Sequence, residues 1–236
     1  MIEQHTQLFR KEISPIPIFL SFAFNVGQNV SANTILSENE MLRYNELKNE
    51  KAKNDYISGR AAAKYALNGL FEKNDPFDYE IKNGIFGEPL VNNAEISISH
   101  SNGFAVAVAS RERLHFGVDT ELITNRYTKS INSIMTENEK KMAIDGFSHL
   151  CFWTAKEAIS KVFNTGLASN FNIYEMNTIK ITEYGYSSLF INFPQYIAHT
   201  FRNGNYLTTI VVPTKIEIEL PFDKELKGKI WKIYTE

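Results

Sequence analysis

Two short segments of this chain carry residue types that together could support chemistry on a phosphate. Asp119 and Glu121 close an apolar, strand-like run, and side chains two residues apart on a strand point to the same side. Further along, Glu157 and Lys161 lie one turn apart on the same face of an expected helix. Carboxylates are ligands that Mg²⁺ prefers, and the ion and a lysine can neutralise phosphate oxygens. The four side chains therefore predict a magnesium-dependent reaction on a phosphate.

Each segment alone has an ordinary structural explanation. Carboxylates at the end of a strand are commonly solvated, and Glu157 and Lys161 could form a surface ion pair worth about 0.3–0.5 kcal/mol. However, Trp153 and Ile159 beside that pair favour a partly buried helix. We therefore interpret the two segments as parts of one site.

The elements that must position these residues begin with a buried strand, expected in the apolar run 16–24. Ser37 to Glu40 form a capping box, which predicts the start of a helix. An alanine-rich helix is expected from Tyr56 to Leu67. Three strands should follow, at 96–100, 104–110 and 114–118, the first two forming a hairpin with a loop of two or more residues.

The second half of the chain is expected to repeat this plan. A second capping box, Thr136 to Glu139, precedes the helix that carries the candidate site. Matching the two long helices places Arg60 opposite Glu157 and Lys64 opposite Lys161, which indicates an internal repeat of roughly a hundred residues. Coincidence is the alternative, because capping boxes and alanine-containing helices are common. Further strands are expected at 178–182, 189–193 and 206–212.

Composition excludes several classes of protein. The 236 residues can form one large domain or two small ones. A net charge of −2 argues against a protein that binds nucleic acid through its overall electrostatic field. It does not exclude a local basic pocket for a small anionic ligand. The single cysteine, Cys151, excludes an internal disulfide and a cysteine-based zinc cluster, and we expect it to be buried.

No targeting or membrane segment is evident. The apolar run 16–24 is too short to span a bilayer, so we expect a cytoplasmic protein with no membrane partner. A nucleophile-elbow serine motif, a P-loop and a dinucleotide glycine fingerprint are also missing from the sequence. These absences argue against the commonest hydrolase, kinase and oxidoreductase classes.

Taken in order, four segments resemble the 4′-phosphopantetheinyl transferases of the large, two-lobed Sfp type. The resemblance runs from about residue 16 to Gly166, and beyond about residue 170 only the strand pattern is compatible. The four segments are an aromatic-x-x-Gly-Arg helix at Tyr56–Arg60, the pair Ser99-His100, Gly117-Val-Asp119-Thr-Glu121, and Trp153-Thr-Ala-Lys156-Glu157-Ala-Ile-Ser-Lys161.

The resemblance implies an α+β fold of two similar α/β lobes, residues 1–112 and 113–236, related by a pseudo-twofold axis with the active site in the cleft between them. It implies transfer of the 4′-phosphopantetheine of coenzyme A to a serine of an acyl or peptidyl carrier protein, with release of adenosine 3′,5′-bisphosphate. Asp119, Glu121 and Glu157 would bind Mg²⁺. Glu157 would also act as the base, directly or through a water, and Lys161 would stabilise or protonate the leaving group.

The first lobe would bind the nucleotide of coenzyme A. By the same resemblance Ser99 and His100 face the nucleotide, Arg60 is a candidate for gripping its 3′-phosphate, and Lys64 is a second cation on that helical face. The chain departs from many relatives at Glu88, where a lysine often lies. Either another lysine, such as Lys53, replaces that contact, or affinity for coenzyme A is lower.

A second class of function stays open, a non-catalytic protein of the same fold that binds coenzyme A or a carrier domain. The complete set of three carboxylates and Lys161 favours the enzyme. Because both lobes lie in one chain, we expect a monomer.

Overall fold

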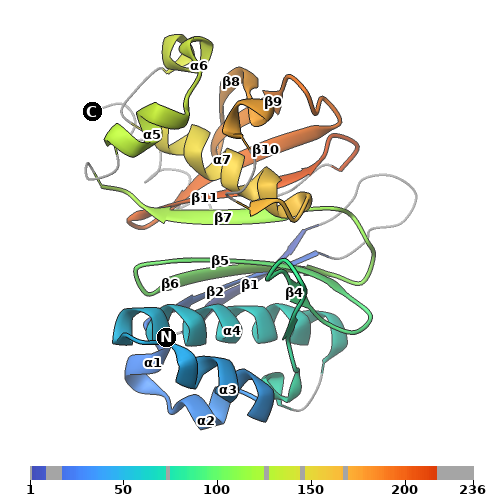
Figure 1. Ribbon diagram of the computed structural model, residues 1–236. Coiled ribbons are helices and arrows are strands. Elements are labelled where there is room, and N and C mark those ends of the chain that lie inside the picture. Colours follow the sequence, from blue (N-terminus) through green and yellow to red (C-terminus); the bar gives the residue numbers. More distant parts are fainter. Residues whose placement is uncertain are drawn as a thin grey trace.

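The computed structural model describes residues 2–8, 18–72, 75–124, 128–143, 147–166 and 170–216. In these ranges the chain forms two antiparallel sheets that lie against each other, each covered on its outer face by a long helix (Figure 1). The first sheet has the strand order β1-β2-β6-β5, and the second has the order β7-β11-β10-β9-β8. The mixed α+β class expected from the sequence is confirmed. The described residues include no helix that is long and apolar enough to cross a membrane.

The elements of the first half all lie before residue 111. They are β1 (Ile2–Leu8), β2 (Ile18–Phe24), α1 (Val26–Asn29), α2 (Ala32–Ile35), α3 (Glu38–Glu46), α4 (Glu50–Phe71), the 3₁₀ helix η1 (Pro76–Asp78), β3 (Lys82–Asn83), β4 (Pro89–Leu90), β5 (Glu95–Ser101) and β6 (Phe104–Ser110). Those of the second half are β7 (Gly117–Leu122), α5 (Thr128–Ile134), α6 (Glu137–Met142), α7 (Ser148–Val162), the 3₁₀ helix η4 (Phe171–Tyr174), β8 (Met176–Thr182), β9 (Gly185–Phe190), β10 (Tyr196–Asn203) and β11 (Tyr206–Pro213).

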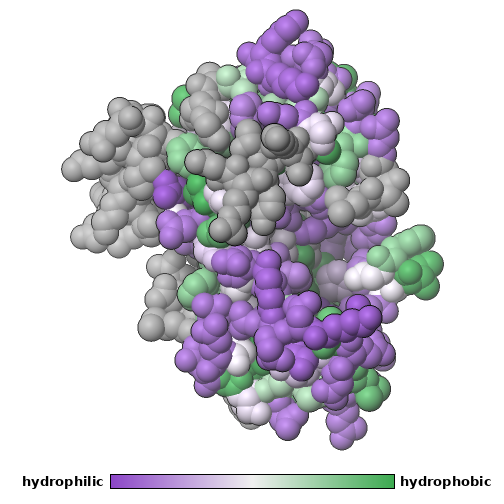
Figure 2. Space-filling model, turned by 60° about the vertical axis from the view of Figure 1, so that its left-hand side comes forward, coloured by the Kyte–Doolittle hydropathy of each residue, from purple (hydrophilic) through white to green (hydrophobic). Residues whose placement is uncertain are grey.

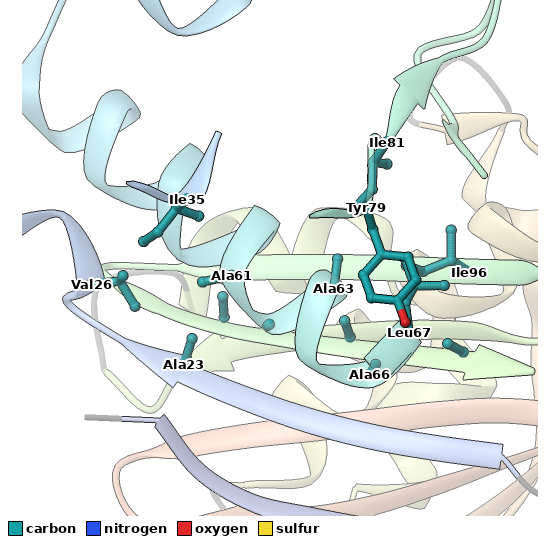
Figure 3. Close-up of a cluster of buried hydrophobic side chains, with 14 of the residues drawn as sticks. Ala23, Val26, Ile35, Ala61, Ala63, Ala66, Leu67, Tyr79, Ile81 and Ile96 are labelled. Carbon is teal, nitrogen blue, oxygen red and sulfur yellow. The ribbon is translucent and has the colours of Figure 1, made fainter. Parts of the chain in front are cut away.

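Alternation along the strands divides the interior into three cores. On β6, Phe104, Val106 and Val108 face the opposite sheet, whereas Ala105, Ala107 and Ala109 face α4. The small alanines allow α4, which is itself alanine-rich on the facing side, to approach the sheet closely (Figure 3). The third core lies between α7 and the second sheet, where Cys151 is buried as expected. The middle core joins the two halves of the chain.

The local signals in the sequence were mostly accurate. Both capping boxes are confirmed, with reciprocal hydrogen bonds at Ser37 and Thr136. The β5–β6 loop contains only Asn102 and Gly103, both with positive φ, as a two-residue hairpin turn requires. Several strand predictions were wrong. The strand expected from Leu114 is β7, which runs from Gly117 to Leu122. The strand expected at 189–193 is β9, which ends at Phe190, and β10 was not predicted.

The two halves repeat one set of polar contacts. The Glu40 carboxylate of the first capping box forms an ion pair with Lys64, with 2.6 Å between Oε2 and Nζ, and Lys64 also donates to the carbonyl of Ile35. In the second half Glu139 forms an ion pair with Lys156 at 2.7 Å, and Lys156 donates to the carbonyl of Ile134. A repeated arrangement of this kind is what a pseudo-twofold relation between the lobes predicts.

This repeat corrects the helical register expected from the sequence. Lys64 is equivalent to Lys156, because each is buried and bound to the glutamate of its own capping box. Lys161 lies five positions further along α7 and has different partners. The expected pairing of Lys64 with Lys161 is therefore wrong, and so is the pairing of Arg60 with Glu157.

Gly117 allows α7 to lie close against the first strand of its sheet. A Cβ atom on Gly117 would overlap the backbone carbonyl oxygen of Ala158, so no side chain fits without moving the helix. The glycine therefore sets the distance between β7 and the helix that carries Glu157.

We expect Gly117→Ala to lower the free energy of unfolding by about 1–3 kcal/mol, because the added methyl group must push α7 away from β7. Chemical denaturation measures this change. Gly204→Ala is the matched control, because a Cβ atom at that position would have open space within 4 Å and only the positive φ, 57°, opposes the substitution. Equal losses in the two variants would contradict a role for Gly117 in helix approach.

Candidate active site

The edge strands β5 and β7 of the two sheets run side by side (Figure 1). They are joined by side-chain hydrogen bonds and not by backbone pairing between the strands. Alternate residues of β5 accept hydrogen bonds from alternate backbone N–H groups of β7, at distances of 3.0 to 3.4 Å. We call this set the β5–β7 ladder. Its pairs are Glu95 with Phe116, Ser97 with Val118, Ser99 with Thr120, and Ser101 with Leu122. The ladder satisfies N–H groups on the edge of β7 that would otherwise be unpaired.

Two rungs of the ladder also hold the carboxylates of β7. Ser99 Oγ donates to Asp119 Oδ1 at 2.7 Å, and Ser101 Oγ donates to Glu121 Oε2 at 2.7 Å. Asp119 is buried, with 5% of its surface exposed. The site carboxylates are thus fixed from the opposite sheet.

Helix α7 brings the remaining members of the site against these carboxylates. Lys161 Nζ lies 2.9 Å from Asp119 Oδ1 and donates to the carbonyl oxygen of Val118, also at 2.9 Å. The Trp153 side chain, on the same helix, lies close enough to Glu121 to lower the pKa of that carboxyl. The four residues singled out from the sequence therefore meet where β7 faces α7.

The charges of this cluster act on one another. The pKa of Glu157 is raised to about 7, chiefly because burial penalises the carboxylate and also because Asp119 repels it, while Lys161 opposes the rise. Burial and the charge of Asp119 also raise the pKa of Glu121. Raised pKa values in a partly buried group of carboxylates are typical of functional sites.

The donor set fits a hard divalent cation. Asp119 Oδ2 is buried and, among the described residues, has no hydrogen-bond partner, while Oδ1 is already used by Ser99 and Lys161. Oxygen-only ligation by carboxylates suits Mg²⁺. In the part of the chain that the structure describes, no three carboxylate, histidine or cysteine side chains are already gathered closely enough to hold an ion. To coordinate one cation together with Asp119, the side chains of Glu121 and Glu157 would have to turn towards it.

A cavity of about 560 Å³ opens beside Lys161 and is lined by residues of both halves of the chain. Lys161, Arg113 and His115 contribute cationic or titratable groups, and Glu88 and Glu95 contribute acidic ones. The space-filling view shows the molecule hollowed between its upper and lower halves (Figure 2). The cavity is large enough for a sizeable part of a nucleotide-containing ligand.

Ser99 and His100, expected to face a nucleotide, have different surroundings. Ser99 is buried, and its hydroxyl donates to Asp119. His100 is exposed at the end of β5. Protein atoms packed around its ring still lower its pKa by desolvation, and the charges of Asp55, Lys161 and Asp119 also act on it. His100 thus lies near the charged cluster.

Arg60 and Lys64 make buried contacts within the first half of the chain. Lys64 is completely buried against Glu40, and Arg60, 7% exposed, stacks over the Tyr56 ring with 4.8 Å from Cζ to the ring centroid. Arg60 also donates to Asn83 and lies near Glu40, 3.5 Å from Nε to Oε1. Both cations therefore tie α4 to the first capping box, because their charges are neutralised there.

Two functional positions were not predicted from the sequence. Ser101 donates a hydrogen bond to Glu121, and Trp153 lies close enough to lower the pKa of that carboxyl. Only the packing of β5 and α7 against β7 reveals these neighbours. One signal was present: polar residues alternate through β5 at Glu95, Ser97, Ser99 and Ser101. Lys53, the suggested substitute for a lysine at position 88, lines a different recess.

The buried ion pair of the first half gives a test of the structural role of Lys64. We expect Lys64→Met to lower the free energy of unfolding by about 3–5 kcal/mol, because Glu40 loses its partner inside the protein. The double variant Glu40→Gln, Lys64→Met should recover part of that loss in urea denaturation. Additive losses in the double variant would contradict coupling between the two side chains.

The raised pKa of Glu157 predicts a pH-dependent penalty on stability. Below pH 4.5 the group is protonated in both the folded and the unfolded chain, whereas between pH 4.5 and about 7 only the unfolded chain ionises freely, so stability falls as pH rises. In EDTA, Glu157→Gln should therefore be more stable than the wild type by on the order of 1–3 kcal/mol at pH 8, and by less at pH 5. Thermal denaturation across this range measures the difference. A difference that does not vary with pH would contradict the assigned shift.

One family model and a set of solved structures match part of this chain. The family model of the 4′-phosphopantetheinyl transferase superfamily matches residues 115–211, a segment that contains β7, α7, β8 to β10 and most of β11. Among solved structures, a holo-(acyl-carrier-protein) synthase from Bacillus anthracis str. Ames in complex with CoA (3′,5′-ADP) is 24% identical, with a TM-score of 0.36. That match covers 44% of this chain and 96% of the synthase chain. No curated protein matches the chain.

Proposed function

We propose that this chain transfers the 4′-phosphopantetheine of coenzyme A to a serine of a carrier protein, a function supported by the match of residues 115–211 to the family model of the 4′-phosphopantetheinyl transferase superfamily. The observation that carries the proposal is the meeting of Asp119, Glu121, Glu157 and Lys161 between β7 and α7. Three mutually repelling carboxylates beside a lysine lower stability, so their assembly is best explained by chemistry.

In this proposal Glu157 takes the proton of the incoming serine hydroxyl, directly or through a water. A carboxylate with a pKa of about 7 is matched to that task near neutral pH. The serine oxygen forms a bond to the phosphorus next to the pantetheine arm, and the bond from that phosphorus to the bridging oxygen breaks. Adenosine 3′,5′-bisphosphate leaves, and Lys161 offsets the negative charge on its new terminal phosphate oxygen or protonates it.

Asp119, Glu121 and Glu157 would hold the Mg²⁺ ion. When bound, such an ion neutralises the pyrophosphate oxygens and makes the phosphorus easier to attack. The unpaired Oδ2 of Asp119 supports this assignment.

We propose that coenzyme A lies in the cavity beside Lys161, between lobes formed by residues 1–112 and 113–236. Arg113 and Lys161 on its wall supply cations for phosphate groups, in place of Arg60 and Lys64. His100, exposed near the charged cluster, stays a candidate contact for the same substrate. Because Glu88 on the cavity wall is acidic, we expect a lower affinity for coenzyme A than a lysine at that position would give. A monomer would suffice, because both walls of the cavity come from one chain.

An apo carrier protein incubated with this protein, coenzyme A and Mg²⁺ should gain the mass of one phosphopantetheine, measured by intact mass spectrometry. We expect Glu157→Gln to slow the transfer by about 10²–10⁴-fold, because the serine hydroxyl loses its base. Binding of coenzyme A without any mass gain by the carrier would instead favour a non-catalytic binding protein.

The matched control is Glu137→Gln, the same substitution at an exposed glutamate of α6 that pairs with Lys140. It should leave transfer unchanged. Because Glu157→Gln is expected to be at least as stable as the wild type at pH 8, loss of transfer in that variant cannot be ascribed to unfolding. Wild-type activity in Glu157→Gln would rule out its role as base.

A further inference from the structure

Ser99 and Ser101 each make two hydrogen bonds with β7. Ser99 Oγ accepts from the Thr120 N–H at 3.3 Å and donates to Asp119 Oδ1 at 2.7 Å. Ser101 Oγ accepts from the Leu122 N–H at 3.4 Å and donates to Glu121 Oε2 at 2.7 Å. Each serine therefore binds one carboxylate of β7 and the backbone N–H of the residue that follows it.

This double bonding fixes the direction of each hydroxyl proton. A serine hydroxyl has one proton to donate and lone pairs that accept. Because the backbone N–H of β7 points at a lone pair, the proton is directed at the carboxylate. Hydrogen bonds to a charged acceptor are also short and strong, which agrees with the 2.7 Å distances.

Each serine thus occupies one carboxylate oxygen and leaves the other outside that hydrogen bond. At Asp119 the result is visible: Oδ1 is bound by Ser99 and Lys161, whereas Oδ2 is buried and has no hydrogen-bond partner among the described residues. A buried carboxylate oxygen without a partner is unfavourable unless a cation or donor meets it.

We propose that Ser99 and Ser101 are positioning residues that orient Asp119 and Glu121 to bind a divalent cation. This inference rests on the proposed function, because it takes the cation site as given. Partners of this kind typically contribute 10–100-fold to metal affinity.

Ser97 provides a matched control within the same ladder. It accepts from the Val118 N–H at 3.0 Å and is as buried as Ser99, but no contact joins it to a site carboxylate. Replacing Ser97 by alanine removes a rung of the ladder and leaves the carboxylates held. The Ser97→Ala variant therefore distinguishes a general weakening of the β5–β7 contact from a specific loss of carboxylate orientation.

The experiment measures binding of Mn²⁺ alone by electron paramagnetic resonance, with no coenzyme A or carrier protein present. We expect Ser99→Ala and Ser101→Ala each to weaken Mn²⁺ binding by about 10–100-fold. Ser97→Ala should bind Mn²⁺ as the wild type does, although thermal denaturation shows a comparable loss of stability. Ser101→Thr keeps the hydroxyl and should restore most of the affinity.

Glu121→Ala separates failure of this inference from failure of the proposed cation site. If Glu121→Ala weakens Mn²⁺ binding and Ser101→Ala does not, the positioning role is overturned and the cation site stands. Equal weakening in Ser97→Ala and Ser101→Ala would also overturn it, because the effect would then come from the ladder as a whole. Wild-type Mn²⁺ binding by Glu121→Ala would overturn both the inference and the proposed cation site.

Discussion

The β5–β7 ladder is the interaction on which the rest of the structure depends. It lies at the junction of the two sheets, where no backbone pairing joins the strands, and it supplies acceptors to the edge N–H groups of β7. The same serines orient two of the three site carboxylates. Contact between the halves and the orientation of these carboxylates therefore depend on one set of side chains.

The two halves of the chain share one structural arrangement, but only the second half places candidate site residues on its long helix. In each half a capping-box glutamate binds a buried lysine of the long helix, which fixes the short helix against the long one. In the first half Arg60 joins this structural cluster. In the second half Glu157 and Lys161 lie beyond the equivalent position and face β7, where they meet Asp119. The residues proposed to carry the chemistry thus belong to one copy of the repeat.

Concentrating carboxylates at this junction is unfavourable for the folded chain. The raised pKa values of Glu121 and Glu157 show that burial and mutual repulsion oppose ionisation there. Lys161 offsets part of that repulsion, and the packing around Gly117 holds α7 in place against it. The cation of the proposed function would relieve the remainder, since it adds positive charge beside these carboxylates.

Local sequence determined much of this protein. Capping boxes, the alanine-rich helix, the β5–β6 hairpin and the grouping of Asp119, Glu121, Glu157 and Lys161 follow from patterns a few residues long, because caps, turns and helical faces depend on near neighbours. Only tertiary structure decided the roles of Lys64, Arg60, Ser99 and Ser101. The sequence does not say which buried partner a lysine or serine meets, because that partner comes from another element whose register is set by packing.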